Sequence, residues 1–448
     1  MPNYRPLKIL AALAAPILIF VNCTTSNNDS GDGSTSGATG PAVPTNDLPQ
    51  PIVGEKVYGF CKVTDWPQGT TPQAPAGFKV TRFAEGFDHP RWLYQLPNGD
   101  ILVAEANTEP KPPPADLTED QKRQLTEGRQ ACDRPGKSAN RITVLRDSNR
   151  DGVFETRQTF VSGLKQNFGM LLLGDQFYVA NTDSLLKFPY KTGDLTLAGS
   201  GEKILDLPAG GYNNHWTRNL IAKPDGSKIY ISIGSASNVA EHGIEEERRR
   251  ANILEINPDG SGERIFASGL RNPVGMEWSG NTLYTAVNER DELGDELVPD
   301  YLTSVRENGF YGWPYSYYGN NEDPRRAGER PDLVEDAIIP DVALGSHTAS
   351  LGLEIYKGEK FPQKYRGGAF IGQRGSWNRS QLAGYKVVFV PFANGRPSGP
   401  PEDFLTGFIK DPATREVNGR PVGILELQDG SILVTDDVTG IVWRVSAE

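Results

Sequence analysis

The fold is indicated most clearly by the stretch Pro421-Val422-Gly423-Ile424, followed by Gln428-Asp429-Gly430-Ser431-Ile432-Leu433-Val434-Thr435-Asp436. An apolar segment leads into an Asp-Gly pair, and a second apolar segment follows it. Asp-Gly supplies the positive φ angles that a tight hairpin turn requires. The stretch therefore predicts two antiparallel strands joined by a short turn.

The same unit occurs five more times. Its other copies begin near Pro90, Phe168, Asn219, Asn272 and Leu351. Each unit predicts a small sheet that cannot cover both of its faces alone, so six units predict an all-β chain folded as a six-bladed β-propeller. Loops at one end of such a ring carry function. The largest insertion expected there is 107–140, which contains a charged helical stretch from Asp116 to Gln130.

The N-terminus has the pattern of an export signal. Arg5 and Lys8 precede an uncharged, mostly apolar run from Ile9 to Val21, and Cys23 follows closely. The run is too short to cross a membrane comfortably as a helix. The pattern resembles a bacterial lipoprotein signal. It predicts a signal peptide over residues 1–22, a lipid-anchored tether over 23–50 with Cys23 lipidated, and a folded domain over 51–448.

Such an N-terminus predicts a protein that is exported and anchored in a membrane, on the periplasmic side or at the cell surface. Residues 24–50 are mostly polar and small, which is typical of a flexible tether. Beyond Cys23 the chain has only Cys61 and Cys132. A disulfide between them and two separate buried thiols are both compatible with the sequence.

The charge pattern points away from nucleic acid as a partner. The formal net charge is −11, and no basic stripe is present. The run from Glu245 to Arg250 joins three acidic to three basic residues, which predicts a solvated segment whose charges pair with one another.

Histidine and arginine residues stand at the junctions that lead into the repeated units. His215 precedes the third unit, where an imidazole with a pKa near neutrality can act as a general base. Arg271 and Asn272 precede the fourth unit, Arg374 follows the fifth, and Arg420 precedes the sixth. Arginines that converge from several units predict a site for an anionic ligand.

The segment from Asp147 to Glu155 matches the first half of a calcium-binding loop, because oxygen-bearing side chains alternate before Gly152. Gln158 stands where the loop pattern places a bidentate glutamate. A tight, Asp-rich hairpin turn is the favoured interpretation of this segment, and a calcium site is the alternative.

Several short sequence motifs, taken in their order along the chain, resemble the glucose/sorbosone dehydrogenase family of quinoprotein propellers, most closely its L-sorbosone dehydrogenase branch. They include Asp88-His89-Pro90-Arg91, Phe168-Gly169-Met170, Asn213-Asn214-His215, Gly269-Leu270-Arg271-Asn272-Pro273, Gly375-Ser376-Trp377-Asn378-Arg379 and Gly419-Arg420-Pro421-Val422-Gly423. The resemblance covers roughly residues 75–445. It implies that pyrroloquinoline quinone, with calcium, oxidises a small sugar-like alcohol or aldehyde.

The resemblance also implies roles for particular residues. His215 matches the base that removes the substrate's hydroxyl proton, and Arg271 with Asn272 matches the pair that contacts the quinone oxygens. Arg420 matches an arginine that binds the cofactor's carboxylates. Two further residues are assigned to the cofactor, namely Arg374, which stands in place of a family lysine, and Gln166, which falls near a family glutamine beside the substrate.

The resemblance places calcium on the segment Asn288 to Glu296, whose backbone carbonyls match the family's metal-holding loop. Glu289, Arg290 and Asp295 lie in this segment, and Glu289-Arg290 replaces the Gly-Pro of the glucose-oxidising members. Two other functions stay open, a calcium-dependent propeller lactonase and a non-enzymatic surface lipoprotein that binds a ligand. The sequence does not identify the electron acceptor.

Overall fold

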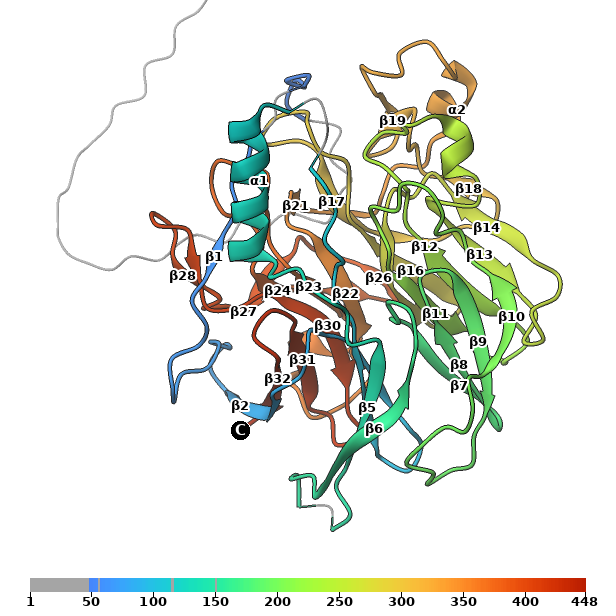
Figure 1. Cartoon of the computed structure of the whole chain (residues 1–448), viewed down its shortest axis with the longest axis vertical. Coiled ribbons are helices and arrows are strands. Elements are labelled where there is room, and N and C mark those ends of the chain that lie inside the picture. Colours follow the sequence, from blue (N-terminus) through green and yellow to red (C-terminus); the bar gives the residue numbers. More distant parts are fainter. Residues whose placement is uncertain (1–47, 55–56, 114–116, 150) are drawn as a thin grey trace, which may run out of the picture. The chain divides into compact units, whose positions relative to one another are not determined.

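The computed structural model describes residues 48–54, 57–113, 117–149 and 151–448. The predicted signal peptide, the lipidation site at Cys23 and most of the predicted tether lie outside these residues. Within them, no helix is both long enough and apolar enough to cross a membrane. The fold is dominated by β-strands, which confirms the all-β prediction (Figure 1).

The strands of the described chain form six main sheets, each built on four antiparallel strands, and in five of these sheets the four strands follow one another along the chain. The first sheet contains β3 (Pro90–Gln95), β4 (Ile101–Glu105), β5 (Arg141–Arg146) and β6 (Thr156–Ser162). The second contains β7 (Met170–Leu173), β8 (Gln176–Ala180), β9 (Ser184–Pro189) and β10 (Glu202–Asp206). The third contains β11 (Arg218–Ala222), β12 (Ile229–Ile233), β13 (Asn252–Ile256) and β14 (Arg264–Ser268).

The last three sheets contain β15 (Pro273–Ser279), β16 (Thr282–Val287), β17 (Pro299–Ser304) and β21 (Val342–Ser346); β22 (Ser350–Ile355), β23 (Ala369–Gln373), β24 (Lys386–Val390) and β27 (Glu402–Leu405); and β30 (Pro421–Glu426), β31 (Ile432–Asp436), β32 (Ile441–Ala447) and β2 (Phe78–Glu85). The sixth sheet therefore joins the beginning of the folded chain to its end, because β2 pairs with β32. Each repeated unit of the sequence supplies the first two strands of one sheet.

Smaller elements lie in the connections. They are β1 (Lys62–Val63), β28 (Ile409–Asp411) and β29 (Glu416–Val417) in one sheet, β18 (Gly309–Phe310) beside β14, the pairs β19 (Ser316–Tyr317) with β20 (Asn321–Glu322) and β25 (Phe392–Ala393) with β26 (Arg396–Pro397), the helices α1 (Glu119–Cys132) and α2 (Pro331–Asp336), and the 3₁₀ turns η1 (Ile244–Glu247) and η2 (Gln363–Tyr365). Helix α1 agrees with the helical stretch predicted in the insertion.

The first strands of the six sheets contact one another in cyclic order, β3 with β7, β7 with β11, and onward through β15, β22 and β30 back to β3. Two glycines show how close this approach is. A Cβ atom on Gly352 would lie 2.1 Å from the carbonyl oxygen of Val422, and one on Gly423 would lie 2.7 Å from that of Arg91. No side chain fits at either place, so the repeated glycine allows neighbouring sheets to pack.

Each junction between neighbouring sheets has its own apolar cluster. Leu185 of the second sheet and Leu254 of the third share one cluster, and Ile371 of the fifth and Leu302 of the fourth share another. A fully buried side chain of this size contributes about 1.5–3 kcal/mol. The core is thus spread over the junctions, and it holds the strand ends, where the site residues lie, in fixed positions.

Cys61 and Cys132 form a disulfide, so of the two arrangements compatible with the sequence the structure has the bonded one. The bond fastens the end of α1 to the strand-forming segment at β1, and α1 stands beside β1 (Figure 1).

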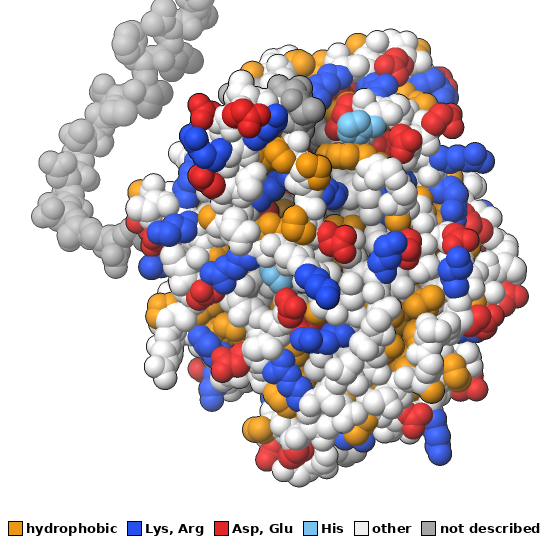
Figure 2. All heavy atoms as spheres, viewed as in Figure 1, with side chains coloured by type: hydrophobic (Ala, Val, Ile, Leu, Met, Phe, Trp, Pro, Cys, Tyr) orange, Lys and Arg blue, Asp and Glu red, His pale blue; other side chains and the backbone are white. Residues whose placement is uncertain are grey.

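The charged run from Glu245 to Arg250 differs from the prediction. Glu247 is only 6% exposed and accepts hydrogen bonds from the backbone N–H groups of Ala236 and Ser237. Arg250 is also 6% exposed and donates to Asn213 Oδ1. These two residues fix the loops around them instead of pairing in solvent. On the face visible in Figure 2, basic and acidic side chains are interspersed.

The carboxylates of Glu277, Glu354 and Glu426 lie on the first strands of three neighbouring sheets and influence one another. They make the free energy of unfolding depend on pH. Burial, followed by the charge of Glu277, raises the pKa of Glu354 well above its usual value. Glu354 therefore keeps its proton in the folded chain at pH values where the unfolded chain, with a pKa near ~4.3, has lost it. The resulting stability is complete below the unfolded pKa and is lost as the pH rises through the folded pKa.

We expect Glu354→Gln, which mimics the protonated form, to leave stability unchanged near pH 4 and to raise it at pH 8 by about 1 kcal/mol, the usual size of a point-mutation effect. Denaturant unfolding across this pH range measures the difference. Glu335→Gln, at an exposed position in α2, is the matched control. Equal pH dependence in wild type and Glu354→Gln would contradict the assignment.

Candidate functional site

The predicted site residues lie at one end of the sheets. In antiparallel sheets the start of each first strand meets the end of each second strand. His215 precedes β11, Arg271 and Asn272 precede β15, and Arg420 precedes β30, while Arg374 follows β23. The tertiary structure thus brings these residues to the same end of neighbouring sheets, where the insertion 107–140 also begins and ends.

His215 has a defined tautomer. Its Nδ1 lies 2.9 Å from the carbonyl oxygen of Ser235 and 3.0 Å from Ser235 Oγ. The carbonyl oxygen can only accept, and the Ser235 hydroxyl donates its proton to the Ser237 carbonyl oxygen at 2.6 Å. Nδ1 therefore carries the hydrogen, and the lone pair of the ring lies on Nε2.

The ring is also neutral. Burial and then the charge of Arg271 lower the pKa of His215 well below its usual value. Within the described chain, no hydrogen-bonding partner contacts Nε2 of His215. A half-buried, uncharged imidazole with a free Nε2 is in the protonation state that a general base requires.

Asn272 and Gly234 border His215. A Cβ atom on Gly234 would lie 2.2 Å from Asn272 Oδ1 and 2.6 Å from His215 Cβ, so these two side chains flank the glycine closely. Asn272 is 5% exposed, and its Oδ1 is buried without a hydrogen-bonding partner. An unsatisfied buried amide beside a free base marks a place for a polar ligand group.

Arg271 is buried and has its donors bound within the chain. Its side chain is 1% exposed and pairs with Asp291 at 3.0 Å. It also donates to the Glu289 carbonyl oxygen at 2.5 Å and to Asn238 Oδ1 at 3.0 Å. Asn378 donates to the other oxygen of Asp291 at 2.6 Å. Arg271 therefore holds together the loops after β12 and β16 beside His215.

The segment predicted to hold calcium has carbonyl oxygens that are already bound within the chain. The carbonyl oxygens of Asn288 and Glu289 face the Arg271 guanidinium, which repels a cation. Arg290 is buried beside Asp323, 3.3 Å away, and Asp295 accepts hydrogen bonds from Ser380. The donor set of this loop therefore does not fit a calcium ion. The cause lies in long-range packing around Arg271, which the family pattern does not reveal.

Burial raises the pKa of Glu289 to about 7, and its Oε1 is buried without a hydrogen-bonding partner.

Gln166 lies elsewhere at this end of the sheets. It is 8% exposed, accepts from no group at the site, and donates from Nε2 to the Asn107 carbonyl oxygen at 3.0 Å. Gln166 thus fastens the start of the insertion.

The insertion approaches His215 through its first residues. Thr108 accepts a hydrogen bond from Trp216 Nε1 at 3.0 Å, and Lys111 donates to the Asn213 carbonyl oxygen. Burial and then the charge of Arg129 lower the pKa of Lys111 to about 8. The sequence did not single out Lys111. Its only sequence signal was its place in the Pro-rich start of the insertion.

Of the three arginines predicted to converge, Arg374 and Arg420 share a cluster with acidic partners that the sequence analysis missed, whereas Arg271 pairs with Asp291. Arg374 pairs with Asp133 at 2.8 Å and with Asp437 at 2.7 Å, and Arg420 also contacts Asp133. Arg91 pairs with the same Asp437 at 2.9 Å. The Arg91 guanidinium lies 5.2 Å from the ring of Trp216, so the cluster borders the His215 region.

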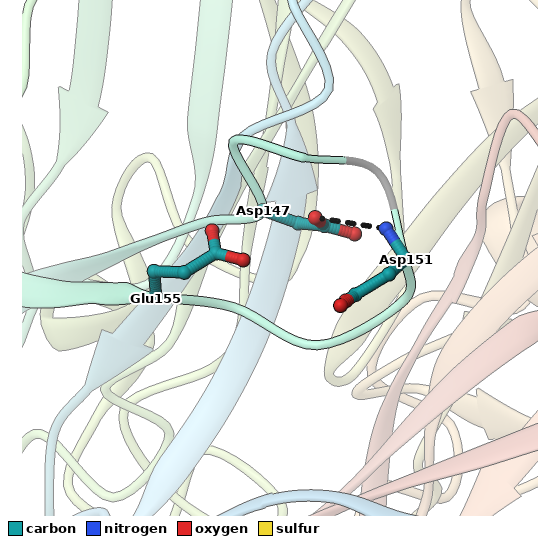
Figure 3. A group of neighbouring side chains, drawn as sticks. All are labelled: Asp147, Asp151 and Glu155. Carbon is teal, nitrogen blue, oxygen red and sulfur yellow. Dashed lines mark hydrogen bonds between the residues drawn. The ribbon is translucent and has the colours of Figure 1, made fainter.

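The turn between β5 and β6 contains the three carboxylates of Asp147, Asp151 and Glu155 within 4.8 Å of one another. Figure 3 shows them gathered inside the turn, with the Asp151 N–H donating to Asp147 at 3.2 Å. β5 ends at this turn and begins at the end of the sheets where His215 lies. The turn is therefore at the opposite end from the candidate site.

The fit to pyrroloquinoline quinone is uneven. The free Nε2 of His215 fits a substrate hydroxyl group, which would donate to it, whereas the unsatisfied Oδ1 of Asn272 is also an acceptor and fits a donor group of the ligand rather than a quinone oxygen. Arg420, which the resemblance assigns to the cofactor's carboxylates, and Arg374, which it assigns to the cofactor in place of a family lysine, are both already bound by Asp133. The residues thus provide a base for the substrate and leave the cofactor's carboxylates without the free arginine that the resemblance implied.

Sequence comparisons place the chain among known proteins. The family described as "Domain of unknown function (DUF7133)" matches residues 75–376, and one described as "TrAA12-like" matches residues 333–448. An uncharacterised protein of Borreliella burgdorferi is 34% identical over 247 residues, which cover 54% of this chain and 63% of that protein. The chain thus matches less than two thirds of that relative's length. A pyrroloquinoline quinone-dependent pyranose dehydrogenase of Coprinopsis cinerea is 25% identical over 297 residues, which cover 52% of this chain and 40% of that protein.

Solved structures share the fold over most of the chain. The family AA12 carbohydrate-active enzyme of Trichoderma reesei has a TM-score of 0.67 at 17% identity, covering 86% of this chain and 99% of that one. The pyrroloquinoline quinone domain of the C. cinerea pyranose dehydrogenase has a TM-score of 0.66 at 18% identity, covering 86% and 100%. These likenesses confirm the predicted resemblance at the level of the fold. The chain belongs to the DUF7133 family, and it has the fold of the pyrroloquinoline quinone-dependent sugar dehydrogenases.

Proposed function

We propose that this protein is a pyrroloquinoline quinone-dependent dehydrogenase that oxidises a sugar, or an alcohol or aldehyde derived from one. The six sheets are the blades of a six-bladed β-propeller in this proposal. The observation that carries it is His215, a neutral imidazole with Nδ1 held as a donor and Nε2 free, at the strand ends beside Asn272. The fold likeness to quinoprotein sugar dehydrogenases supports the choice of chemistry.

His215, Asn272 and Arg271 have separate roles in this proposal. The bound quinone supplies a two-electron acceptor, which the protein positions. His215 Nε2 accepts the hydroxyl proton of the substrate, and Ser235 keeps the ring in the required tautomer. Asn272 Oδ1 accepts a hydrogen bond from a donor group of the ligand. Arg271 keeps Asn288 and Asp291 in place beside His215.

We further propose that the protein is exported and anchored in a membrane through Cys23, on the periplasmic side or at the cell surface. The disulfide between Cys61 and Cys132 supports export, because such bonds persist mainly in oxidising compartments. Sorbosone is one candidate substrate within the sugar-derived class. Calcium is a candidate second cofactor. A separate molecule must accept the electrons from the reduced quinone.

The first experiment is a titration of the full chain with pyrroloquinoline quinone, with and without calcium, followed by tryptophan fluorescence. Dye reduction is then measured on a panel of sugars, sorbosone and other aldehydes. We expect saturable binding and dye reduction on at least one substrate. Absence of quinone binding in both arms would overturn the proposal, and hydrolysis of a lactone panel would then identify a propeller lactonase.

A further inference from the structure

The carboxylate of Asp133 lies between two arginines from different sheets. Arg374 Nη1 is 2.8 Å from Asp133 Oδ1, and Arg420 Nη1 contacts the same oxygen. The Arg420 side chain is 1% exposed and that of Arg374 is 13% exposed. Burial would raise the pKa of Asp133, but Arg374 and Arg420 outweigh it and hold this pKa well below its usual range. Asp133 is thus ionised and forms a charge-assisted contact with both arginines.

A backbone hydrogen bond and a neighbouring disulfide hold Asp133 in this position. Its backbone N–H closes α1 by donating to the Arg129 carbonyl oxygen at 2.8 Å. The preceding residue, Cys132, is bonded to Cys61, which lies next to β1, and β1 pairs with β29. The carboxylate therefore stays at the arginine pair without any ligand.

The cluster around this pair carries little net charge. Arg91, Arg374 and Arg420 share Asp133 and Asp437 as direct partners. A third carboxylate, Asp436, accepts hydrogen bonds from the Arg420 backbone N–H at 2.8 Å and from a tryptophan ring. An anionic ligand would meet arginines whose charge is already balanced inside the protein.

We propose that Asp133 is an internal carboxylate that occupies the arginine pair Arg374–Arg420 and so weakens the binding of multiply charged carboxylate ligands at this end of the protein. Asp133 is in this role a specificity-determining residue, because it selects against ligands that need both arginines. The choice of pyrroloquinoline quinone as one probe rests on the proposed function. The effect itself rests only on the charges of the cluster.

The test compares the full chain with its Asp133→Asn variant, which keeps the shape of the side chain and removes its charge. Isothermal titration measures the affinity for two probes, pyrroloquinoline quinone and citrate, a simple tricarboxylate. The matched control is Asp65→Asn, which removes the carboxylate of an ion pair with Arg134 (2.8 Å) whose two side chains are much more exposed, 55% for Asp65 and 35% for Arg134. We expect Asp133→Asn to bind at least one probe tenfold or more tighter than wild type, and Asp65→Asn to bind both as wild type does.

Unchanged or weaker binding of both probes by Asp133→Asn would overturn the proposal, and so would an equal gain in the control. Tighter citrate binding with no quinone binding in any variant would support the role of Asp133 and refute the proposed function. Asp133→Ser, which leaves room for water beside the arginines, gives the same test if Asp133→Asn does not fold. Asp133→Glu keeps the charge, and we expect it to restore the weak binding of wild type.

Discussion

Replacing His215 with glutamine is expected to lower turnover about 10²–10⁴-fold, the usual contribution of a general base, while quinone affinity changes little. The geometry gives the reason. The Nδ1–H group of His215 is bound by Ser235, and the free Nε2 is the proton-accepting atom. A glutamine amide can still donate to Ser235, but it has no basic lone pair. Steady-state dye reduction and fluorescence titration separate the two effects.

His242→Gln is the matched control for this experiment. His242 is exposed and stacks on Tyr212, with ring centroids 4.3 Å apart, in a charged loop. We expect this variant to keep turnover within about twofold of wild type. Equal turnover in wild type and His215→Gln would exclude His215 as the base, and a parallel loss of quinone affinity would show that the ring only holds the cofactor.

Replacing Arg271 with glutamine is expected to destabilise the chain by about 3–5 kcal/mol, because it leaves Asp291, whose side chain is only 20% exposed, without its arginine partner. Arg271 also donates to Glu289 and Asn238, so the loops after β12 and β16 lose a common anchor. Denaturant unfolding at neutral pH measures the loss.

The double variant Arg271→Gln/Asp291→Asn distinguishes a charge effect from lost packing. Removing both charges is expected to recover about 1–2 kcal/mol of the loss, within the range measured for coupled neighbours. Arg249→Gln is the control. It breaks an ion pair with Glu263 in which both side chains are roughly 30% exposed, and it should cost less than about 1 kcal/mol. A loss below that size in Arg271→Gln would contradict an anchoring role.

The sequence predicted the sheets well, because its signals were local. Asp-Gly and similar pairs mark the turns, and apolar runs mark the strands, so the first two strands of every sheet stand where the repeated units stand. Helix α1 also followed from a local pattern, a charged stretch, and the structure adds a capping box at Thr118. His215 was found because few histidines are present and this one stands at a strand junction.

Charge partners were predicted less well. The run from Glu245 to Arg250 suggested self-pairing in solvent, whereas Glu247 and Arg250 are buried and bind separate loops. The predicted calcium loop followed a family pattern, but Arg271 binds its carbonyl oxygens. The partners of Glu247, Arg250 and Arg271 lie 11, 37 and 18 residues away, in other loops, and no local pattern indicates them.

Local sequence patterns were enough to predict the strands, the turns and the strand ends at which His215, Arg271 and Arg420 stand, because these depend on neighbours a few residues away. Which charges meet depends instead on the tertiary packing. Asp133 reaches Arg420 across 287 residues, and Cys61 reaches Cys132 across 71. Such contacts arise when sheets from both ends of the chain pack side by side, and the balance of charge at the candidate site depends on that packing.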